Sequence, residues 1–295
     1  MGNPHRRTIR SGALVVLALL LPMSACGSGE EAASGDEATT TEAAEETTTT
    51  TEAAAEPLQI LVSNDDGYAA EGIDVLVEAL RELPDVEITV VAPLEQQSGQ
   101  GGKSTVGELA VTEVATASGV EASAVDGFPA DAIRVALDEQ EVEADVVITG
   151  INEGQNLGPL VDISGTVGAA RAAVARGIPA LATSQGSGES FDYEAAVPFI
   201  VDWVEEHREA LLAGDAPLEV VNMNIPSCSE GEVQGLVEVE ADLDGDAGQA
   251  LVDQDCTREL AAEEVSGDVE AFNNGWVTLS VVPDEPATPA EVVGG

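Results

Sequence analysis

From Leu58 onward the chain alternates short apolar runs with amphipathic helical segments. Runs that are apolar throughout are typical of strands buried on both faces, as in parallel sheets covered by helices. The predicted strands span residues 58–63, 86–93, 144–150 and 178–184. One predicted helix carries its apolar face from Ile73 to Leu80, and others span residues 165–177 and 192–214, where Pro198 could introduce a kink. This alternation predicts an α/β, doubly wound fold.

Polar stretches follow three of the predicted strands. They are "NDDG" at residues 64–67, "LEQQSGQGGKST" at residues 94–105 and "INEGQNLGPLVDISGT" at residues 151–166. In doubly wound sheets, ligands bind beyond the carboxyl ends of the strands. We therefore expect all three loops to open on one edge of the sheet.

The first of these loops places two carboxylates side by side, on Asp65 and Asp66. Adjacent carboxylates at a crowded sheet edge repel each other unless they share a cation, and oxygen ligands favour a hard ion such as Mg²⁺ or Mn²⁺. Asn, Asp and Gly are also the preferred residues of turns and helix starts. The spacing by itself therefore leaves a metal site and a plain turn as equal alternatives.

The third loop ends in Ser164-Gly165-Thr166, directly before a predicted helix. Free backbone N–H groups and the helix dipole at such a position can face an anion, although a simple serine or threonine cap is the common alternative. The same loop carries Asn152 and Asn156 among several glycines, which let the backbone approach a ligand closely. Metal ligands beside an anion site suggest phosphoryl hydrolysis.

The first 25 residues have the pattern of a secretory signal: arginines near the start, an apolar run from Ala13 to Met23, and small residues before Cys26. "MSAC" is similar to a bacterial lipobox, which implies cleavage before Cys26 and lipid attached to its thiol. An ordinary cleaved signal is the alternative, and either Sec or twin-arginine export fits. Residues 26–57 are predicted to form a disordered acidic, Thr-rich tether. We therefore expect an exported lipoprotein, anchored at the cell surface through Cys26 alone.

The composition is strongly acidic, with 56 Asp and Glu against 10 Lys and Arg. A surface of this kind repels polyanions, so no nucleic-acid polymer is expected as a partner. Beyond Cys26 the chain holds only Cys228 and Cys256. In an exported domain a disulfide between them is the default expectation, and a metal site is less favoured because no histidine lies near either cysteine in the sequence.

Several ordered segments together resemble the SurE (survival protein) family of metal-dependent 5′/3′-nucleotidases. The resemblance covers about residues 58–283. The segments that carry it are "ILVSNDDGYAAEGI", "VVAPLEQQSGQG", "VDGFPADAIRVAL", "DVVITGINEGQNLG", "SGTVGAA", "GIPALATS", "VVNMNIP" and "DVEAFNNGWVTLSVVP".

This resemblance implies a Rossmann-type three-layer α/β/α sandwich with a mostly parallel sheet, over a domain of residues 58–285. It implies a divalent metal ion, Mg²⁺ or Mn²⁺, held by four residues, and a substrate phosphate held by four. The metal ligands would be Asp65, Asp66, Ser98 and Asn152, and the phosphate would be held by Asn64, Ser164, Gly165 and Thr166. Asp65 or Asp66 could also accept a proton during hydrolysis.

The activity so implied is that of a 5′-nucleotidase or acid-phosphatase-like hydrolase, which cleaves nucleoside 5′- and 3′-monophosphates. With the predicted signal at residues 1–25, we expect this activity outside the cytoplasm, although the family is mostly cytoplasmic. A broad phosphomonoesterase is the alternative within the same class. A non-catalytic metal- or solute-binding lipoprotein is the alternative outside it, although such proteins normally have two similar lobes.

The sequence departs from the family pattern in several places. Phe128 replaces a small residue, Ile163 replaces an aromatic one, and the region from Pro226 to Asp268 is acidic and contains both cysteines. There we expect a shortened, disulfide-closed variant of the family's oligomerisation arm, so a homodimer is possible without being implied. Residues 286–295 are predicted to be a disordered tail.

Overall fold

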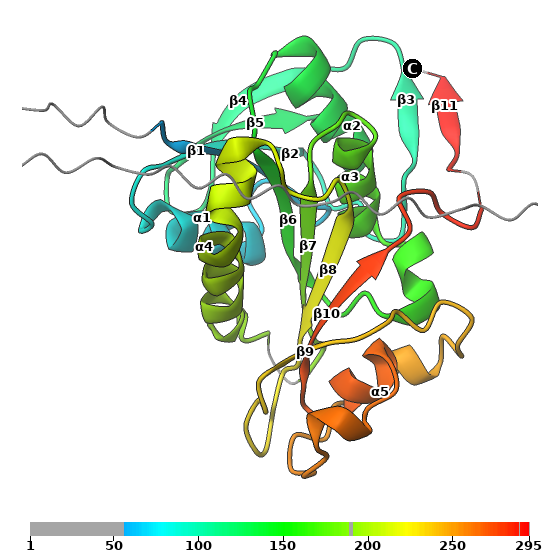
Figure 1. Cartoon of the computed structure of the whole chain (residues 1–295). Helices are drawn as coiled ribbons and strands as arrows, with labels where there is room; N and C mark the ends of the chain where they lie inside the picture. The colour runs from blue at the N-terminus through cyan, green and yellow to red at the C-terminus, as the bar shows by residue number, and fades with distance from the viewer. Residues whose placement is uncertain (1–55, 189–190, 289, 295) are drawn as a thin grey trace, which may run out of the picture. The chain divides into compact units, whose positions relative to one another are not determined.

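The computed structural model describes residues 56–188, 191–288 and 290–294 (Figure 1). The predicted signal at residues 1–25, Cys26 and nearly all of the predicted tether at 26–57 lie outside the described residues. None of the helices in the described ranges combines the length and the apolar character needed to span a membrane.

Nine strands form one sheet, in the order β4-β5-β2-β1-β6-β7-β8-β10-β9. The strands are β1 Leu58–Ser63, β2 Val86–Pro93, β4 Val111–Ala115, β5 Glu121–Val125, β6 Val146–Glu153, β7 Ala180–Gln185, β8 Val220–Ile225, β9 Leu236–Glu238 and β10 Val277–Val282. The six from β5 to β8 in this order are parallel, whereas β4 and β10 run antiparallel to β5 and β8. The prediction of a mostly parallel α/β sheet is confirmed.

Helices cover both faces of this sheet. Helices α1 (Glu71–Arg81) and α4 (Val197–Ala213) pack on one face, and α2 (Pro129–Arg134) and α3 (Gly165–Val174) pack on the other (Figure 1). Pro198 lies in the first turn of α4, where a proline fits without a kink, so a kink at this position is not found.

Strand β6 contains one extra residue relative to its neighbour β7. Thr149 lies opposite Ala182, and the next pair is Asn152 with Ser184, so three steps in β6 match two in β7. At Gly150 the backbone has φ +129°, and a Cβ atom would lie 2.3 Å from the Thr183 carbonyl oxygen, so only glycine fits. A bulge of this kind re-aims the residues after it. Strand β6 was predicted to end at residue 150, but beyond this bulge it continues to Glu153.

The C-terminal segment forms a second, two-stranded sheet. Strand β11 (Val292–Gly294) pairs in parallel with β3 (Ser104–Val106), and the Ala287 N–H donates to Asp162 Oδ2 at 3.0 Å. The prediction of a disordered tail from residue 286 is therefore wrong for the described residues. The error arose because the tail has few large apolar side chains, whereas strand pairing uses backbone groups.

Cys228 and Cys256 form a disulfide with a Cα–Cα distance of 5.7 Å, as predicted. The disulfide closes the segment 229–255, and this segment contacts the loop that follows β6. Gln155 Nε2 donates to the Ala250 carbonyl oxygen at 3.0 Å. Close by, Leu157 packs with Phe272 of helix α5 (Asp268–Asn273) in a small apolar cluster of its own.

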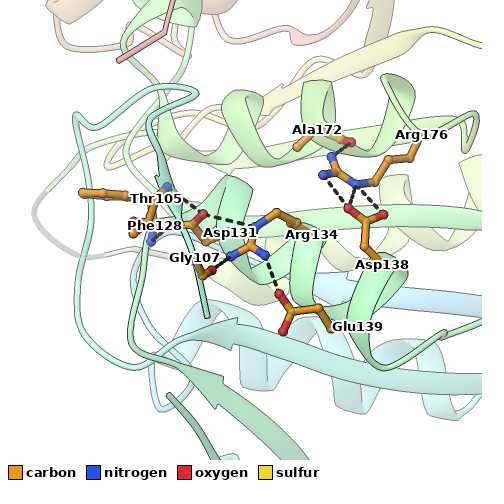
Figure 2. A network of polar contacts seen from close by, with 9 residues as sticks. All are labelled: Thr105, Gly107, Phe128, Asp131, Arg134, Asp138, Glu139, Ala172 and Arg176. Atoms are coloured by element: carbon orange, nitrogen blue, oxygen red, sulfur yellow. Dashed lines mark hydrogen bonds and ion pairs between the residues drawn. The ribbon is translucent and has the colours of Figure 1, made fainter. Parts of the chain in front are cut away.

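Asp131 holds the start of α2 against β3 (Figure 2). Its carboxylate is fully buried and accepts hydrogen bonds from the Thr105 N–H at 2.9 Å and the Phe128 N–H at 3.1 Å. The Arg134 guanidinium lies 3.7 Å away and is also paired with Glu139. Asp131 therefore has a structural role within the "GFPAD" segment.

We expect Asp131→Asn to lower the free energy of unfolding by about 2 to 4 kcal/mol, because the amide leaves a buried backbone N–H without an acceptor. Urea unfolding of the full chain measures this change. Asp138→Asn is the matched control, since Asp138 pairs with Arg176 and its side chain is 48% exposed; it should cost less than about 1 kcal/mol. Equal losses in the two variants would contradict the assignment.

Candidate functional site

The two neighbouring carboxylates lie directly after β1 and differ in exposure. Asp65 is 2% exposed, and its Oδ1 atom accepts a hydrogen bond from Thr166 Oγ1 at 2.6 Å. Asp66 is partly exposed, and its Oδ2 atom accepts from the Glu153 N–H at 3.0 Å. The loops after β1 and β6 and the start of α3 therefore meet at one edge of the sheet, as predicted.

The start of α3 lies in contact with the Asp65 carboxylate. A Cβ atom on Gly165 would lie 2.7 Å from both Cβ and Oδ2 of Asp65. Glycine at this position therefore allows the N-terminus of the helix to approach the carboxylate. The positive end of the helix dipole faces a negative charge there, which stabilises the ionised form.

Ser98 joins the same site from the loop after β2. Its hydroxyl lies 3.4 Å from Asp66 Oδ1 and accepts a hydrogen bond from Gln96 Nε2 at 2.5 Å. The Gln97 N–H donates to the Asp65 carbonyl oxygen at 2.6 Å, which fixes this loop against the end of β1. Gln96, which was not predicted, also approaches Asp66 Oδ1 at 3.4 Å; its position two residues before Ser98 was the available signal.

Two buried amide oxygens at the site have no donor within the described residues. Asn152 is 6% exposed, and its Nδ2 atom donates to the Gly154 carbonyl oxygen at 2.5 Å, while its Oδ1 atom is unpaired. Asn64 Nδ2 donates to the Gly67 carbonyl oxygen at 2.9 Å, and its Oδ1 atom is likewise unpaired. A buried carbonyl oxygen without a donor is costly, and a bound cation would satisfy it.

Burial raises the pKa of both carboxyl groups. For Asp65 the pKa rises from 3.8 to about 7, first because of burial and second because of the Asp66 charge, against the lowering effect of the Thr166 hydrogen bond. For Asp66 the pKa is also raised by burial and by the Glu153 charge, against the hydrogen bond from the Glu153 N–H. A cation between the two groups would reverse both shifts, since it favours the ionised forms.

The predicted phosphate-binding residues are partly engaged within the protein. Ser164 Oγ accepts a hydrogen bond from the Val167 N–H at 3.1 Å, so it caps α3. The Thr166 hydroxyl donates a hydrogen bond to Asp65 Oδ1. Both side chains therefore organise the start of the helix, and Asn64 organises the turn after β1.

A buried asparagine network supports the site from β8 and was not predicted. The Asn156 N–H donates to Asn224 Oδ1 at 2.7 Å, and its carbonyl oxygen accepts from Asn222 Nδ2 at 2.8 Å. Asn156 Nδ2 reaches Ser184 Oγ at 2.9 Å and, more weakly, Thr166 Oγ1 at 3.5 Å. Asparagine is depleted in strands, so the alternation in "VVNMNIP" was a signal that could have pointed to this network.

The donor set fits a hard divalent cation. Among the described residues, no three or more His, Cys, Asp or Glu side chains are grouped so that they could hold a metal ion. A metal ion here would therefore use two carboxylates, on Asp65 and Asp66, completed by the neutral oxygens of Ser98 and Asn152. Mg²⁺ and Mn²⁺ accept such mixed oxygen ligands and retain bound water.

Phe128 and Ile163, the two residues that depart from the family pattern, lie in different places. The Phe128 ring is contacted by the Lys103 ammonium group, 4.9 Å from the ring centroid, and lies beside β3. Ile163 is 58% exposed, and its carbonyl oxygen accepts from the Gly101 N–H at 3.0 Å. Ile163 therefore adjoins the start of α3, next to the loop that carries Ser98.

The chain is similar to known proteins over most of the described α/β domain. Residues 60–241 match the family model described as Survival protein SurE. The protein named 5′-nucleotidase SurE from Clostridium botulinum strain 657 is 38% identical over 183 residues, which cover 61% of this chain and 71% of the relative. The protein of the same name from Brevibacillus brevis is 40% identical over 187 residues, with the same two coverages.

A solved structure shows the same fold. The crystal structure of the SurE protein from Aquifex aeolicus superposes with a TM-score of 0.60 at 28% sequence identity. The match covers 77% of this chain and 93% of that protein. The similarity therefore extends over about three quarters of this chain and nearly all of that protein.

Proposed function

Because the chain belongs to the SurE family, we propose that it is a metal-dependent 5′-nucleotidase, which hydrolyses nucleoside monophosphates to nucleoside and phosphate. The segment that matches the family model, residues 60–241, contains all the candidate metal- and phosphate-binding residues. We extend the proposal to 3′-monophosphates and to Mg²⁺ or Mn²⁺ as the cofactor.

One observation carries the proposal: a buried carboxylate lies against the start of a helix, and the carboxylate next to it binds the end of β6, where a buried amide oxygen has no donor within the described residues. The carboxylates belong to Asp65 and Asp66, and the oxygen is Asn152 Oδ1. A plain turn would need neither a buried carboxylate against α3 nor an amide oxygen without a donor. A cation and a phosphate together would satisfy both.

The residues of the chain have separate tasks in the proposed reaction. When bound, a divalent ion polarises the phosphoryl group and makes a water molecule more acidic. Asp65 and Asp66 hold that ion, and Asp66, on the exposed side, can accept a proton from the attacking water. The backbone N–H groups at the start of α3 would stabilise the negative charge that phosphoryl oxygens gain during the reaction. Thr166 keeps Asp65 oriented through its 2.6 Å hydrogen bond.

Release of inorganic phosphate from AMP tests the proposal. We expect chelator-stripped full chain to be inactive, and Mg²⁺ or Mn²⁺ to restore activity. Asp66→Asn should lower kcat/KM by about a hundredfold or more, since it removes a charged ligand. The surface variant Asp138→Asn is the control and should retain activity. Activity of the stripped protein equal to that of the metal-loaded one would reject metal dependence.

Two other functions predict different results in the same assay. A broad phosphomonoesterase would release phosphate from simple phosphate esters as fast as from AMP. A metal- or solute-binding lipoprotein would bind AMP or the metal ion tightly in equilibrium dialysis without turnover. We favour the nucleotidase because one α/β body is described here and it is matched by 5′-nucleotidase relatives over 61% of the chain.

We also propose that the protein is exported and anchored through lipid on Cys26. The sequence of residues 1–26 motivates this, and the Cys228–Cys256 disulfide is in keeping with an oxidising compartment. Metabolic labelling with an alkyne fatty acid should mark the wild-type chain and leave Cys26→Ala unmarked. Equal labelling of both would refute lipidation at this residue. A homodimer stays a prediction, which light scattering of the full chain tests.

A further inference from the structure

The C-terminal segment, residues 283–288 and 290–294, contacts two of the three site loops. Its strand β11 pairs in parallel with β3, which directly follows the loop that carries Ser98 (Figure 1). Its Ala287 N–H donates to Asp162 Oδ2 at 3.0 Å, and Asp162 lies just before the start of α3. The segment therefore joins the end of the second site loop to the third.

The Asp162 carboxylate binds this segment with one oxygen and α3 with the other. Its Oδ1 atom accepts a hydrogen bond from Arg171 Nη2 at 3.0 Å, and Arg171 is only 6% exposed. Arg171 Nε in turn donates to the Pro283 carbonyl oxygen at 2.8 Å. Asp162 and Arg171 therefore hold the C-terminal segment at two places, Pro283 and Ala287.

The Ser98 loop, residues 94–103, is in contact with both α3 and the C-terminal segment. A Cβ atom on Gly168 of α3 would lie 2.3 Å from the Gly101 carbonyl oxygen, so the backbone of the loop lies directly on the helix. A Cβ atom on Gly102 would lie 3.3 Å from Ala290 Cβ, so the next residue of the loop adjoins the C-terminal segment. The end of the loop is therefore held by both.

Ser98 itself has few contacts that fix its position. It is exposed, and within the described ranges its hydroxyl is bound only to Gln96 and, more weakly, to Asp66. The first part of the loop is fixed by the Gln97 N–H, which donates to the Asp65 carbonyl oxygen at 2.6 Å. None of residues 94–103 lies in a helix or strand. The distance from Ser98 to the carboxylates therefore depends on how both ends of the loop are held.

We propose that the C-terminal segment is a strap that positions the Ser98 loop for metal binding, and that Asp162 is a positioning residue that holds the strap in place. This inference rests on the proposed function. Both act through Ser98, whose hydroxyl would complete the ligands of the metal ion. If the strap is released, only a fraction of the molecules has the loop in place, and the apparent affinity for the ion falls by that fraction.

A single cleavage site reports whether the strap holds the loop. Lys103 is the only lysine in the chain, and its ammonium group lies 3.3 Å from the Glu291 carboxylate of the strap. A lysine-specific endoprotease can therefore cut the full chain only after Lys103. We expect Asp162→Ala to speed this cut about tenfold under native conditions, because it removes the carboxylate that binds Ala287 and Arg171.

Asp138→Ala is the matched control. Asp138 also pairs with an arginine, Arg176, but this pair lies beyond the other end of α3, and no hydrogen bond or ion pair joins Asp138 to the described part of the strap. The control should be cut at the wild-type rate. Equal rates in wild type and Asp162→Ala, or equal increases in the two variants, would overturn the inference.

Metal binding shows whether the strap serves the site or only the stability of the fold. Calorimetry should show that Asp162→Ala binds Mn²⁺ about tenfold more weakly than wild type. Saturating Mn²⁺ should slow the cut after Lys103 back toward the wild-type rate, since the ion and the strap favour the same position of the loop. A loss of stability alone would leave the Mn²⁺ affinity of the folded protein unchanged, and that result overturns the inference.

A cross-link holds the loop without Asp162. A Cβ atom on Gly102 would lie near Ala290 Cβ at close to the spacing of a disulfide, so Gly102→Cys with Ala290→Cys should form one after a small shift. Cys26→Ala in the same chain leaves these as the only free thiols, because the other two cysteines are bonded to each other. The oxidised cross-link should restore wild-type Mn²⁺ affinity to Asp162→Ala, and Gly102→Cys alone should not. A cross-linked chain that still binds Mn²⁺ weakly would contradict the inference.

These measurements separate failure of the inference from failure of the proposed function. If wild type binds Mn²⁺ but releases no phosphate from AMP, the nucleotidase proposal fails, and the cleavage rates and Mn²⁺ affinities still decide whether the strap positions the loop. If wild type binds no Mn²⁺, both proposals fail.

Discussion

Asp65→Asn is expected to abolish metal-dependent phosphate release while making the metal-free protein more stable at pH 8. The amide removes the buried charged ligand, which should lower kcat/KM by about a thousandfold or more. It also removes the cost of an ionised carboxylate that is only 2% exposed. Loss of function together with a gain in stability is the result expected of a binding site that is strained without its cation.

The sign of the pH dependence follows from the raised pKa of Asp65. Its pKa is 3.8 in the unfolded chain and about 7 in the metal-free fold, so the folded state holds the proton more tightly. The stabilisation is complete below about pH 4 and is lost as the pH rises to about 7. The loss amounts to about 2 to 4 kcal/mol for one group. Metal-free wild type should therefore lose more stability than Asp65→Asn between pH 5 and pH 8.

Thermal unfolding with and without Mn²⁺ measures these effects. Mn²⁺ should raise the Tm of wild type and leave that of Asp65→Asn unchanged. Many other carboxylates also repel one another as the pH rises, and Asp138→Asn reports that background because Asp138 is exposed. A variant at Asp65 that binds Mn²⁺ with wild-type affinity would show that the ion lies elsewhere.

Gly165→Ala should weaken metal binding and phosphate release about a hundredfold, although it adds only one methyl group. The new Cβ would lie 2.7 Å from Cβ and Oδ2 of Asp65, so the carboxylate or the start of α3 must move. Alanine favours the helix itself by up to about 1 kcal/mol, so the folded body should survive with a modest loss from the clash. The expected result is a folded protein with a displaced ligand.

Calorimetric titration with Mn²⁺, beside far-UV circular dichroism, checks this prediction. Gly248→Ala is the control, since Gly248 is exposed and its nearest neighbour is the Asp246 side chain at 3.1 Å. It should bind Mn²⁺ as wild type does. Wild-type affinity in Gly165→Ala would mean that the contact with Asp65 has no part in holding the ion.

The strongly apolar strands could be predicted from the sequence, and the weakly apolar ones could not. Strands β1 and β2 agree with the predicted residues 58–63 and 86–93, because apolar runs there end at clear turn residues. Strand β4 was missed because it is largely exposed and carries few apolar contacts. Strand β11 was missed because its pairing with β3 depends on backbone groups nearly 190 residues apart.

The candidate site divides in the same way. The two carboxylates, Ser98 and Asn152 could be proposed because short motifs and a family resemblance marked them. The contacts around them could not be predicted, because they join distant segments: Thr166 to Asp65 across 101 residues, and Asn156 to Asn224 across 68. Asn222 lies in a strand, and its hydrogen bond to the Asn156 carbonyl oxygen can be recognised only once the order of the strands is known.

The Cys228–Cys256 disulfide makes the 229–255 segment a candidate for exchange by protein engineers. Because ring closure costs only slightly more entropy as a loop grows, a graft of different length between the two cysteines should leave the sheet from β4 to β10 intact, although it removes the edge strand β9. The graft would also remove the Ala250 carbonyl oxygen, which accepts a hydrogen bond from Gln155 in the third site loop. Such an exchange should therefore lower the turnover rate more than it lowers the melting temperature.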